Sequence, residues 1–212
     1  DEHLWAEIYD RELTAANIFA IQSEIATAIA KALHATLSPE EQERLATIPT
    51  KNLAAYEAYL LGKQRMATRT NEKLVEAAAY FEQAIELDPA FALAYVGLSD
   101  SYQLQTVYSD LPQAKMNALS KNAINMALTL NDNLAEAYAS LGLLRQNNHD
   151  YGGAKVAYLK AMTLNANYAT TYHWYGTLLE ELGKVTKASV QMQKALTLDP
   201  LSIIINAGVA SY

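Results

Sequence analysis

The sequence predicts an all-α fold, built as an array of antiparallel helix pairs with extra helices before it. The first observation is a set of residue pairs at intervals of 37, 43, 34 and 34 residues: Leu61-Gly62, Leu98-Ser99, Leu141-Gly142, Tyr175-Gly176 and Val209-Ala210. A second series runs out of phase with the first, at intervals of 43, 34 and 34 residues: Ala84, Ala127, Ala161 and Ala195. Two coupled series near a 34-residue period indicate a helix-turn-helix array, whose surface suits binding rather than catalysis.

The composition excludes several classes of protein. The 212 residues include no Cys, so we expect neither a disulfide nor a thiolate site. The formal net charge of −7 argues against nucleic acid and anionic membranes as partners, because both attract basic surfaces. No apolar run is long enough to cross a bilayer. The absence of Cys fits a cytoplasm and a periplasm equally well, so the localisation stays open.

Residues 1–51 are expected to form an N-terminal segment that links the array to an upstream domain. Alternating apolar residues over 1–9 suggest a short strand. A helix is expected over 14–37, packed on the first repeats or on the upstream domain. Its apolar stripe follows mostly four-residue steps, at Ile18, Ile21, Ile25, Ile29, Leu33 and Leu37. Since the sequence begins with Asp1 and stops inside a repeat, we expect it to be part of a longer chain.

The stretch Ser38-Pro39-Glu40-Glu41 has the pattern of a helix start. The serine can cap the helix, and the proline suits its first position. The second glutamate stands where a capping box needs a carboxylate. This short helix should end near Thr47, and a break over 48–50 precedes the next helix.

The array itself is expected over 52–212, as four repeats and the first helix of a fifth. The first repeat has helices around 53–67 and 72–87, with about three extra residues in the turn between them. The second repeat carries nine extra residues before Ser120, where Asp110-Leu111-Pro112 suggests a lengthened, separately capped second helix. The third and fourth repeats have the regular length.

These residues resemble the tetratricopeptide repeat. Its pattern has a large residue, then Leu-Gly and an aromatic, followed by Ala, an aromatic, Ala and Pro at fixed offsets. The small positions lie where two helices cross closely, and the proline ends the second helix. The sequence departs from this pattern at Ser99, Asp132 and Ala166, where Gly, Pro and Pro are expected. The resemblance covers about 53–212 and implies a right-handed superhelix that binds proteins or peptides.

The N-terminal part has a second resemblance, to a segment that precedes such repeats in bacterial signalling proteins. It is carried by LWAEIYDREL over 4–13, IFAIQSEI over 18–25, SPEEQ over 38–42 and YEAYLLG over 56–62. Such segments occur in class III adenylate/guanylate cyclases and in membrane-bound winged-helix regulators similar to CadC. The resemblance implies a parent with its catalytic or DNA-binding domain upstream, in some members beyond an inner-membrane helix. It implies no activity for this sequence.

We expect no catalytic, cofactor-binding or metal-binding residues. No pair of the four histidines stands at i, i+4, and none has a carboxylate or thiol at metal-ligand spacing: His3, His34, His149 and His173. Glu180 and Glu181 are adjacent on a helix and point about 100° apart, so they do not share a substrate. Gly152-Gly153 has no lysine and no strand before it, and is expected to be a turn rather than a phosphate loop.

The expected binding surface is the concave groove, which in this family is lined by the first helix of each repeat. Counted from the Leu-Gly pair, the candidates are Tyr59, Lys63, Val96, Asp100, Gln103, Glu136, Leu143, Gln146, Asn147, Thr170, His173, Thr177 and Glu180. Apart from Lys63 and Asn147, this face lacks the Lys, Arg and Asn side chains that clamp a C-terminal carboxylate. We expect a segment with apolar anchors and basic flanks, or another domain of the same chain.

The sequence therefore predicts a non-catalytic interaction or scaffold module in the regulatory part of a bacterial signalling protein. Two alternatives stay open. The sequence is the C-terminal part of an adenylate or guanylate cyclase, or it is a small-ligand sensor module of a CadC-like transcriptional regulator. The irregular first two repeats are expected to dock on the upstream domain, and the regular third and fourth to supply the open groove.

Overall fold

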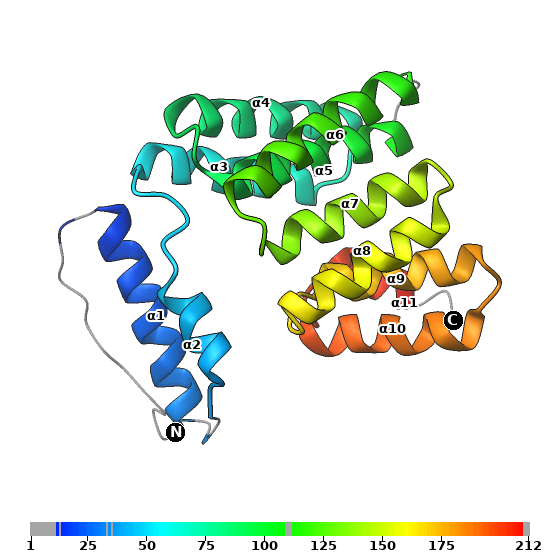
Figure 1. The fold of residues 1–212 in the computed structure, drawn as a ribbon. Helices are drawn as coiled ribbons and strands as arrows, with labels where there is room; N and C mark the ends of the chain where they lie inside the picture. The colour runs from blue at the N-terminus through cyan, green and yellow to red at the C-terminus, as the bar shows by residue number, and fades with distance from the viewer. Residues whose placement is uncertain (1–11, 13, 33, 35, 109–111, 210–212) are drawn as a thin grey trace.

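The structure is a computed structural model that describes residues 12, 14–32, 34, 36–108 and 112–209. Over these ranges it contains eleven helices and no strand; the strand expected at 1–9 lies outside them. The helices are α1 (Ala15–Ala32), α2 (Pro39–Ala46), α3 (Leu53–Ala67), α4 (Asn71–Leu87), α5 (Ala92–Tyr108), α6 (Gln113–Leu130), α7 (Ala135–Asn147), α8 (Tyr151–Leu164), α9 (Ala169–Glu181), α10 (Val185–Leu198) and α11 (Ile203–Val209). Helices α3 to α10 form four antiparallel pairs stacked into a right-handed superhelix, as predicted (Figure 1).

Each helix pair closes around one large side chain from its second helix. These four side chains are at most 2% exposed: Phe81, Ile124, Tyr158 and Met192. In three pairs a glycine of the first helix lies directly against this side chain: Gly62 against Phe81, Gly142 against Tyr158 and Gly176 against Met192. The absence of a side chain at these glycines lets the two helices approach closely, which is why the pattern repeats at this position.

The second pair replaces the glycine with a buried hydrogen bond. Ser99 of α5 and Ser120 of α6 are both fully buried, and their Oγ atoms are 2.9 Å apart. Gln103 Nε2 donates to Ser99 Oγ at 3.2 Å and to the Ser140 carbonyl of α7, also at 3.2 Å. The buried hydroxyl of Ser99, which stands where the pattern has glycine, therefore finds its hydrogen-bond partner in Ser120 of α6.

The three extra residues of the first repeat lengthen α4, so the prediction that they lie in the turn is wrong. A residue with left-handed backbone ends the first helix in three repeats: Arg69 (φ 57°), His149 (φ 60°) and Gly183 (φ 70°). Each stands seven residues after the glycine of its first helix, so the turn is the same in all three. The difference lies in the second helix, because α4 has 17 residues where α8 and α10 have 14.

The insertion in the second repeat lengthens both of its helices. Helix α5 has 17 residues where α7 and α9 have 13, and α6 has 18. The predicted lengthening of α6 is confirmed, whereas the lengthening of α5 was not anticipated. Pro112 stands at the start of α6 and makes no side-chain capping hydrogen bond, so the expected separate cap is not found there; residues 109–111 lie outside the described part.

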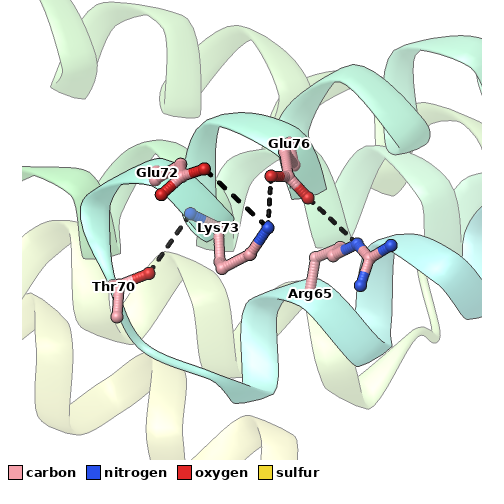
Figure 2. A network of polar contacts seen from close by, with 5 residues as sticks. All are labelled: Arg65, Thr70, Glu72, Lys73 and Glu76. Atoms are coloured by element: carbon pink, nitrogen blue, oxygen red, sulfur yellow. Dashed lines mark hydrogen bonds and ion pairs between the residues drawn. The ribbon is translucent and has the colours of Figure 1, made fainter.

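A polar network attaches the lengthened start of α4 to the end of α3 (Figure 2). Thr70 Oγ1 caps α4 by accepting from the Lys73 backbone N–H at 3.3 Å. Glu76 then joins two cations: its Oε1 lies 2.5 Å from Lys73 Nζ and its Oε2 lies 3.0 Å from Arg65 Nε. Glu72 Oε1 is 4.0 Å from the same Lys73 Nζ. Partly exposed ion pairs contribute about 0.5 kcal/mol each, so this network orients the two helices more than it stabilises them.

Asx side chains, rather than prolines, form the turns between repeats. An Asx oxygen accepts from the backbone N–H two residues later in three turns, each at 3.0 Å: Asp88 to Ala90, Asn131 to Asn133 and Asn165 to Asn167. This local bond forms the turn whether or not a proline follows. The sequence can therefore carry Asp132 and Ala166 where the family pattern has proline.

The predicted glycine turn at 152–153 is instead the first turn of a helix. Gly152 and Gly153 belong to α8, and Asp150 caps this helix by accepting from the Gly153 backbone N–H at 2.9 Å. The carboxylate cap favours helix from residue 151 onward, which outweighs the low helix propensity of two glycines.

Helices α1 and α2 form a hairpin beside the array (Figure 1). The capping box predicted at Ser38 and Glu41 is confirmed, with both of its hydrogen bonds present. Helix α1 ends at Ala32, five residues earlier than predicted, and is followed by His34 with a left-handed φ of 54°. The isoleucine stripe is only partly covered: Ile18, Ile21 and Ile25 are half-buried and Ile29 is 46% exposed, whereas the buried residues are Ala15, Phe19 and Ala30.

We expect Gly142→Ala to lower the free energy of unfolding by about 1–3 kcal/mol, the usual cost of overpacking. An added Cβ would lie 2.5 Å from Cε1 of Tyr158, a rigid ring that is fully buried. Gly176→Ala should cost less than about 1 kcal/mol, because its nearest neighbour is the flexible Met192 at 3.0 Å.

Gly152→Ala is the matched control, since an added Cβ there meets nothing within 4 Å. It should raise the free energy of unfolding by about 0.5 kcal/mol through lower entropy of the unfolded chain. Urea unfolding followed by circular dichroism measures all three variants. Equal effects of the Gly142 and Gly152 substitutions would contradict the close crossing described above.

Candidate functional site

Three cavities lie in series along the concave side of the array. The first, of about 540 Å³, is bounded by the end of α2, the α6–α7 turn and the end of α8. The second, of about 100 Å³, lies between α3, α5 and α7, and the third, of about 420 Å³, lies between the end of α3 and the α10–α11 turn. Leu93 and Glu136 line both the first and second cavities, and Lys63 lines both the second and third. The three cavities therefore form one groove.

Five of the predicted groove residues meet in the second cavity, which we call the central pocket. Its lining consists of Tyr59 and Lys63 from α3, Leu93, Val96, Gly97 and Asp100 from α5, Glu136 from α7, and Tyr168. Tyr168 stands just before α9 and was not predicted, because the family rule counts only residues within the first helices. The central pocket is thus lined by the first helices of three repeats and, on one further side, by the turn before α9.

Asp100 is the most deeply buried acid of the central pocket, at 4% exposed. Its Oδ1 accepts a hydrogen bond from Ser140 Oγ of α7. Burial raises the pKa of Asp100 to about 6, although the Ser140 hydrogen bond and the charge of Lys63 act in the opposite direction. Burial also raises the pKa of Glu136. Over the described residues, neither carboxylate has a cationic partner within 4.0 Å.

The two tyrosines of the central pocket stay neutral, and one of them, Tyr59, packs against other aromatic rings. The Tyr59 ring lies 5.0 Å from that of Phe91 and 5.8 Å from that of Phe81, centroid to centroid. Burial raises the pKa of Tyr59 and of Tyr168 above the ordinary value, so both hydroxyls stay protonated at neutral pH.

Four other predicted residues are used between helices rather than in the central pocket. Gln103 is fully buried, and its Nε2 donates to Ser99 Oγ and to the Ser140 carbonyl. Gln146 is 4% exposed, accepts from Tyr158 Oη at 2.8 Å and donates to Glu181 Oε1 at 2.8 Å. Leu143 packs against the core around Tyr158, and the Asn147 carbonyl accepts from Gln113 Nε2 at 3.0 Å.

The predicted residues of the fourth repeat line none of the three cavities: Thr170, His173, Thr177 and Glu180. Thr177 Oγ1 donates to the Trp174 carbonyl at 2.7 Å. His173 is partly buried beside Gly208 of α11, and burial together with the charge of Arg69 lowers its pKa to about 4. The central pocket therefore rests on the first three repeats, whereas the third and fourth were expected to supply the groove.

Arg69 is a groove residue that the sequence reasoning missed. It lines the third cavity from the left-handed position after α3, where the fourth repeat has Gly183. Its Nε is buried and has no hydrogen-bond partner among the described residues. The only signal in the sequence is an arginine at a turn position, which cannot be distinguished from a solvated side chain.

The N-terminal hairpin forms one wall of the first cavity, which was also not predicted. The cavity is lined by Glu43 and Arg44 of α2 and by Thr47, the residue that follows this helix. The hairpin contacts the array at two separate places. Phe19 packs edge-on against Tyr56 of α3 at 4.6 Å, and Glu41 Oε1 accepts from Asn167 Nδ2 at 2.7 Å in the turn before α9.

The part of the chain that the structure describes contains no group of three or more His, Asp or Glu side chains placed to hold a metal ion. None of the described helices is both long enough and apolar enough to cross a bilayer.

We expect Asp100→Asn to raise the free energy of unfolding at pH 7 by at most about 3 kcal/mol. The folded-state pKa of about 6 lies above the ordinary 3.8, so folding disfavours the ionised form of Asp100. The penalty is absent below about pH 4, develops between pH 4 and 6, and is complete above pH 6. The advantage of the variant should follow the same course, measured by urea unfolding across this range.

The low pKa of His173 affects both proteins equally and cancels in the difference. Asp132→Asn at an exposed turn is the matched control and should show no pH-dependent advantage. If wild type and Asp100→Asn were equally stable at pH 7, the carboxylate would carry no burial penalty and this description of the pocket would be wrong.

Comparison with known proteins agrees with the fold. The family model described as "Tetratricopeptide repeat" matches residues 69–91, 135–168 and 169–200. A solved tetratricopeptide-repeat protein of Thermus thermophilus, TTC0263, is 15% identical, with a TM-score of 0.56 over 93% of this chain and 96% of that one. PilF of Pseudomonas aeruginosa is 19% identical, with a TM-score of 0.52 over 74% of this chain and 67% of that one.

A curated relative in Rhizobium meliloti (strain 1021), provisionally named adenylate cyclase 3, is 34% identical over 97 residues. This match covers 46% of the chain but only 16% of the relative's length. The matches to the family model fall on α4 and on the third and fourth helix pairs, which include the close crossings at Gly142 and Gly176. Residues 69–91, 135–168 and 169–200 are therefore tetratricopeptide repeats, and the resemblance inferred from the spacing is confirmed.

Proposed function

We propose that this chain is a non-catalytic interaction module whose groove binds an extended or helical segment of a protein. The segment belongs to a partner protein or to another domain of the same chain. The observation that carries this proposal is the continuity of the three cavities across the first helices of the array. Their lining combines apolar and charged side chains, as peptide-binding grooves do.

The chemistry of the lining supports a segment with apolar anchors and charged flanks. Leu93 and Val96 supply apolar surface at the centre of the groove. Both acidic and basic side chains line it: Glu43, Arg44, Glu136, Asp100, Lys63, Arg69 and Asp199. Charges placed in this way fix the register of a bound segment more than they add affinity.

We further propose that the module belongs to the regulatory part of a bacterial signalling protein. The similarity to the relative named as an adenylate cyclase supports this context, over 97 residues. Because the chain spans only 16% of that relative, cyclase activity is not carried over to it. A regulatory module of this kind would act by holding a segment of the parent, or of its partner, in the groove.

Selection of peptides from a displayed random library against the full chain tests the groove. We expect enriched peptides whose affinity falls at least about tenfold in Leu93→Arg, because this side chain lines two of the three cavities. Leu159→Arg is the control, since Leu159 is 44% exposed on α8 and lines none of the three cavities.

Fluorescence anisotropy of the enriched peptides gives the affinities, and circular dichroism checks that both variants are folded. Failure to enrich any peptide, or equal affinity for the Leu93 variant and wild type, would count against the groove as the binding surface.

A further inference from the structure

We propose that the central pocket binds one cationic side-chain head of the bound segment, a lysine ammonium or an arginine guanidinium. The cation would lie between the carboxylates of Asp100 and Glu136 and beside the rings of Tyr59 and Tyr168. This inference rests on the proposed function, because it names the chemistry recognised at the centre of the same groove.

The first argument is that neither carboxylate of the central pocket forms an ion pair, although Asp100 is buried and Lys63 lines the same pocket. Asp100 is only 4% exposed, and the one hydrogen bond to its side chain within the described residues is that from Ser140 Oγ on Oδ1. Glu136 is partly buried and accepts from its own backbone N–H. No cation of the described chain lies within 4.0 Å of either. A buried acid that makes no ion pair keeps most of its desolvation penalty, and a cation bound directly against it reduces this penalty.

The second argument is the size of the pocket. Its volume of about 100 Å³ suits one side-chain head, whereas the cavities of about 540 and 420 Å³ on either side can hold the rest of a segment. Leu93 and Val96 line it together with the acids, so the methylene stem of a lysine or arginine would contact apolar surface while its head reaches the carboxylates.

The third argument is the pair of aromatic rings. Tyr59 and Tyr168 approach the pocket from α3 and from the turn before α9. The face of a tyrosine ring attracts a cation, and the attraction grows when water is excluded. The contacts of Tyr59 with Phe91 and Phe81 hold its ring before any ligand arrives. A neutral or anionic head would gain nothing from these rings and would leave the acids unpaired.

Lys63 distinguishes a cationic ligand from an anionic one. It is exposed on α3, lines the edge shared by the second and third cavities, and forms no ion pair with Asp100 or Glu136 within 4.0 Å. A cation entering the pocket is repelled by Lys63, whereas an anion is attracted. Replacing Lys63 with a neutral residue therefore changes the two affinities in opposite directions.

The test uses n-butylammonium and n-butylguanidinium as probes of the full chain, with n-butanol as the neutral analogue. Amide chemical shifts of Asp100, Glu136 and Ser140 report binding by NMR titration at constant ionic strength. We expect both cations to bind at least fivefold more tightly than butanol. Asp100→Asn and Glu136→Gln should each weaken the cations at least fivefold, and Lys63→Gln should strengthen them.

Glu57→Gln is the control, because Glu57 is an exposed acid of the same helix, α3, and lines none of the three cavities. Asn at position 100 can still accept the Ser140 hydrogen bond, so loss of binding there does not reflect loss of the fold. Equal binding of butanol and the cations, unchanged binding in the two acid variants, or weaker binding in Lys63→Gln would each overturn the proposal.

The peptides selected with the full chain separate this inference from the function on which it rests. If they bind in the groove but tolerate replacement of every Lys and Arg by norleucine, the cation pocket is wrong and the interaction function stands. If no peptide is enriched while the cations bind at Asp100, the proposed function fails and the pocket stands as a small-cation site.

Discussion

The close crossing of the two helices in each pair is the constraint on which the rest of the structure depends. A glycine backbone lies against a large buried side chain of the second helix in three of the four pairs. This contact sets the distance and angle within a pair, so that successive first helices line the same concave side. The groove is thus a consequence of packing on the opposite side of the first helices. Its lining residues could vary without changing the shape that presents them.

In the second repeat a pair of hydrogen-bonded serines takes the place of the glycine contact. The hydrogen bonds that begin at these serines continue to the groove. Ser99 and Ser120 bond to each other, Gln103 bonds to Ser99 and to the Ser140 carbonyl, and Ser140 Oγ donates to Asp100. Asp100 is therefore held by α7 through a serine where the fourth repeat has Trp174. The departure from the repeat pattern and the buried acid of the groove belong to one connected set of hydrogen bonds.

The sequence predicted most of the fold and about half of the central pocket. The bounds of α3, the capping box of α2 and the four helix pairs followed from the period and from capping chemistry. The insertions were located less well, because a spacing shows that residues are added but not whether a turn or a helix takes them. Tyr168 and Arg69 were missed since they reach the groove from turns, where no periodicity exists. The isoleucine stripe of α1 is only partly covered, because apolar periodicity identifies one face of a helix but not what packs on it.

The two attachments of the N-terminal hairpin have a mechanical consequence. Helical solenoids bend and stretch by small rotations between neighbouring repeats, which accumulate along the chain. The hairpin contacts Tyr56 in the first repeat and Asn167 at the junction of the third and fourth, bypassing the interfaces between them. The hairpin therefore connects the first repeat to the junction of the third and fourth by a route separate from the interfaces between neighbouring repeats. Uncoiling of the first three repeats must therefore either strain the hairpin or break the exposed Glu41–Asn167 hydrogen bond.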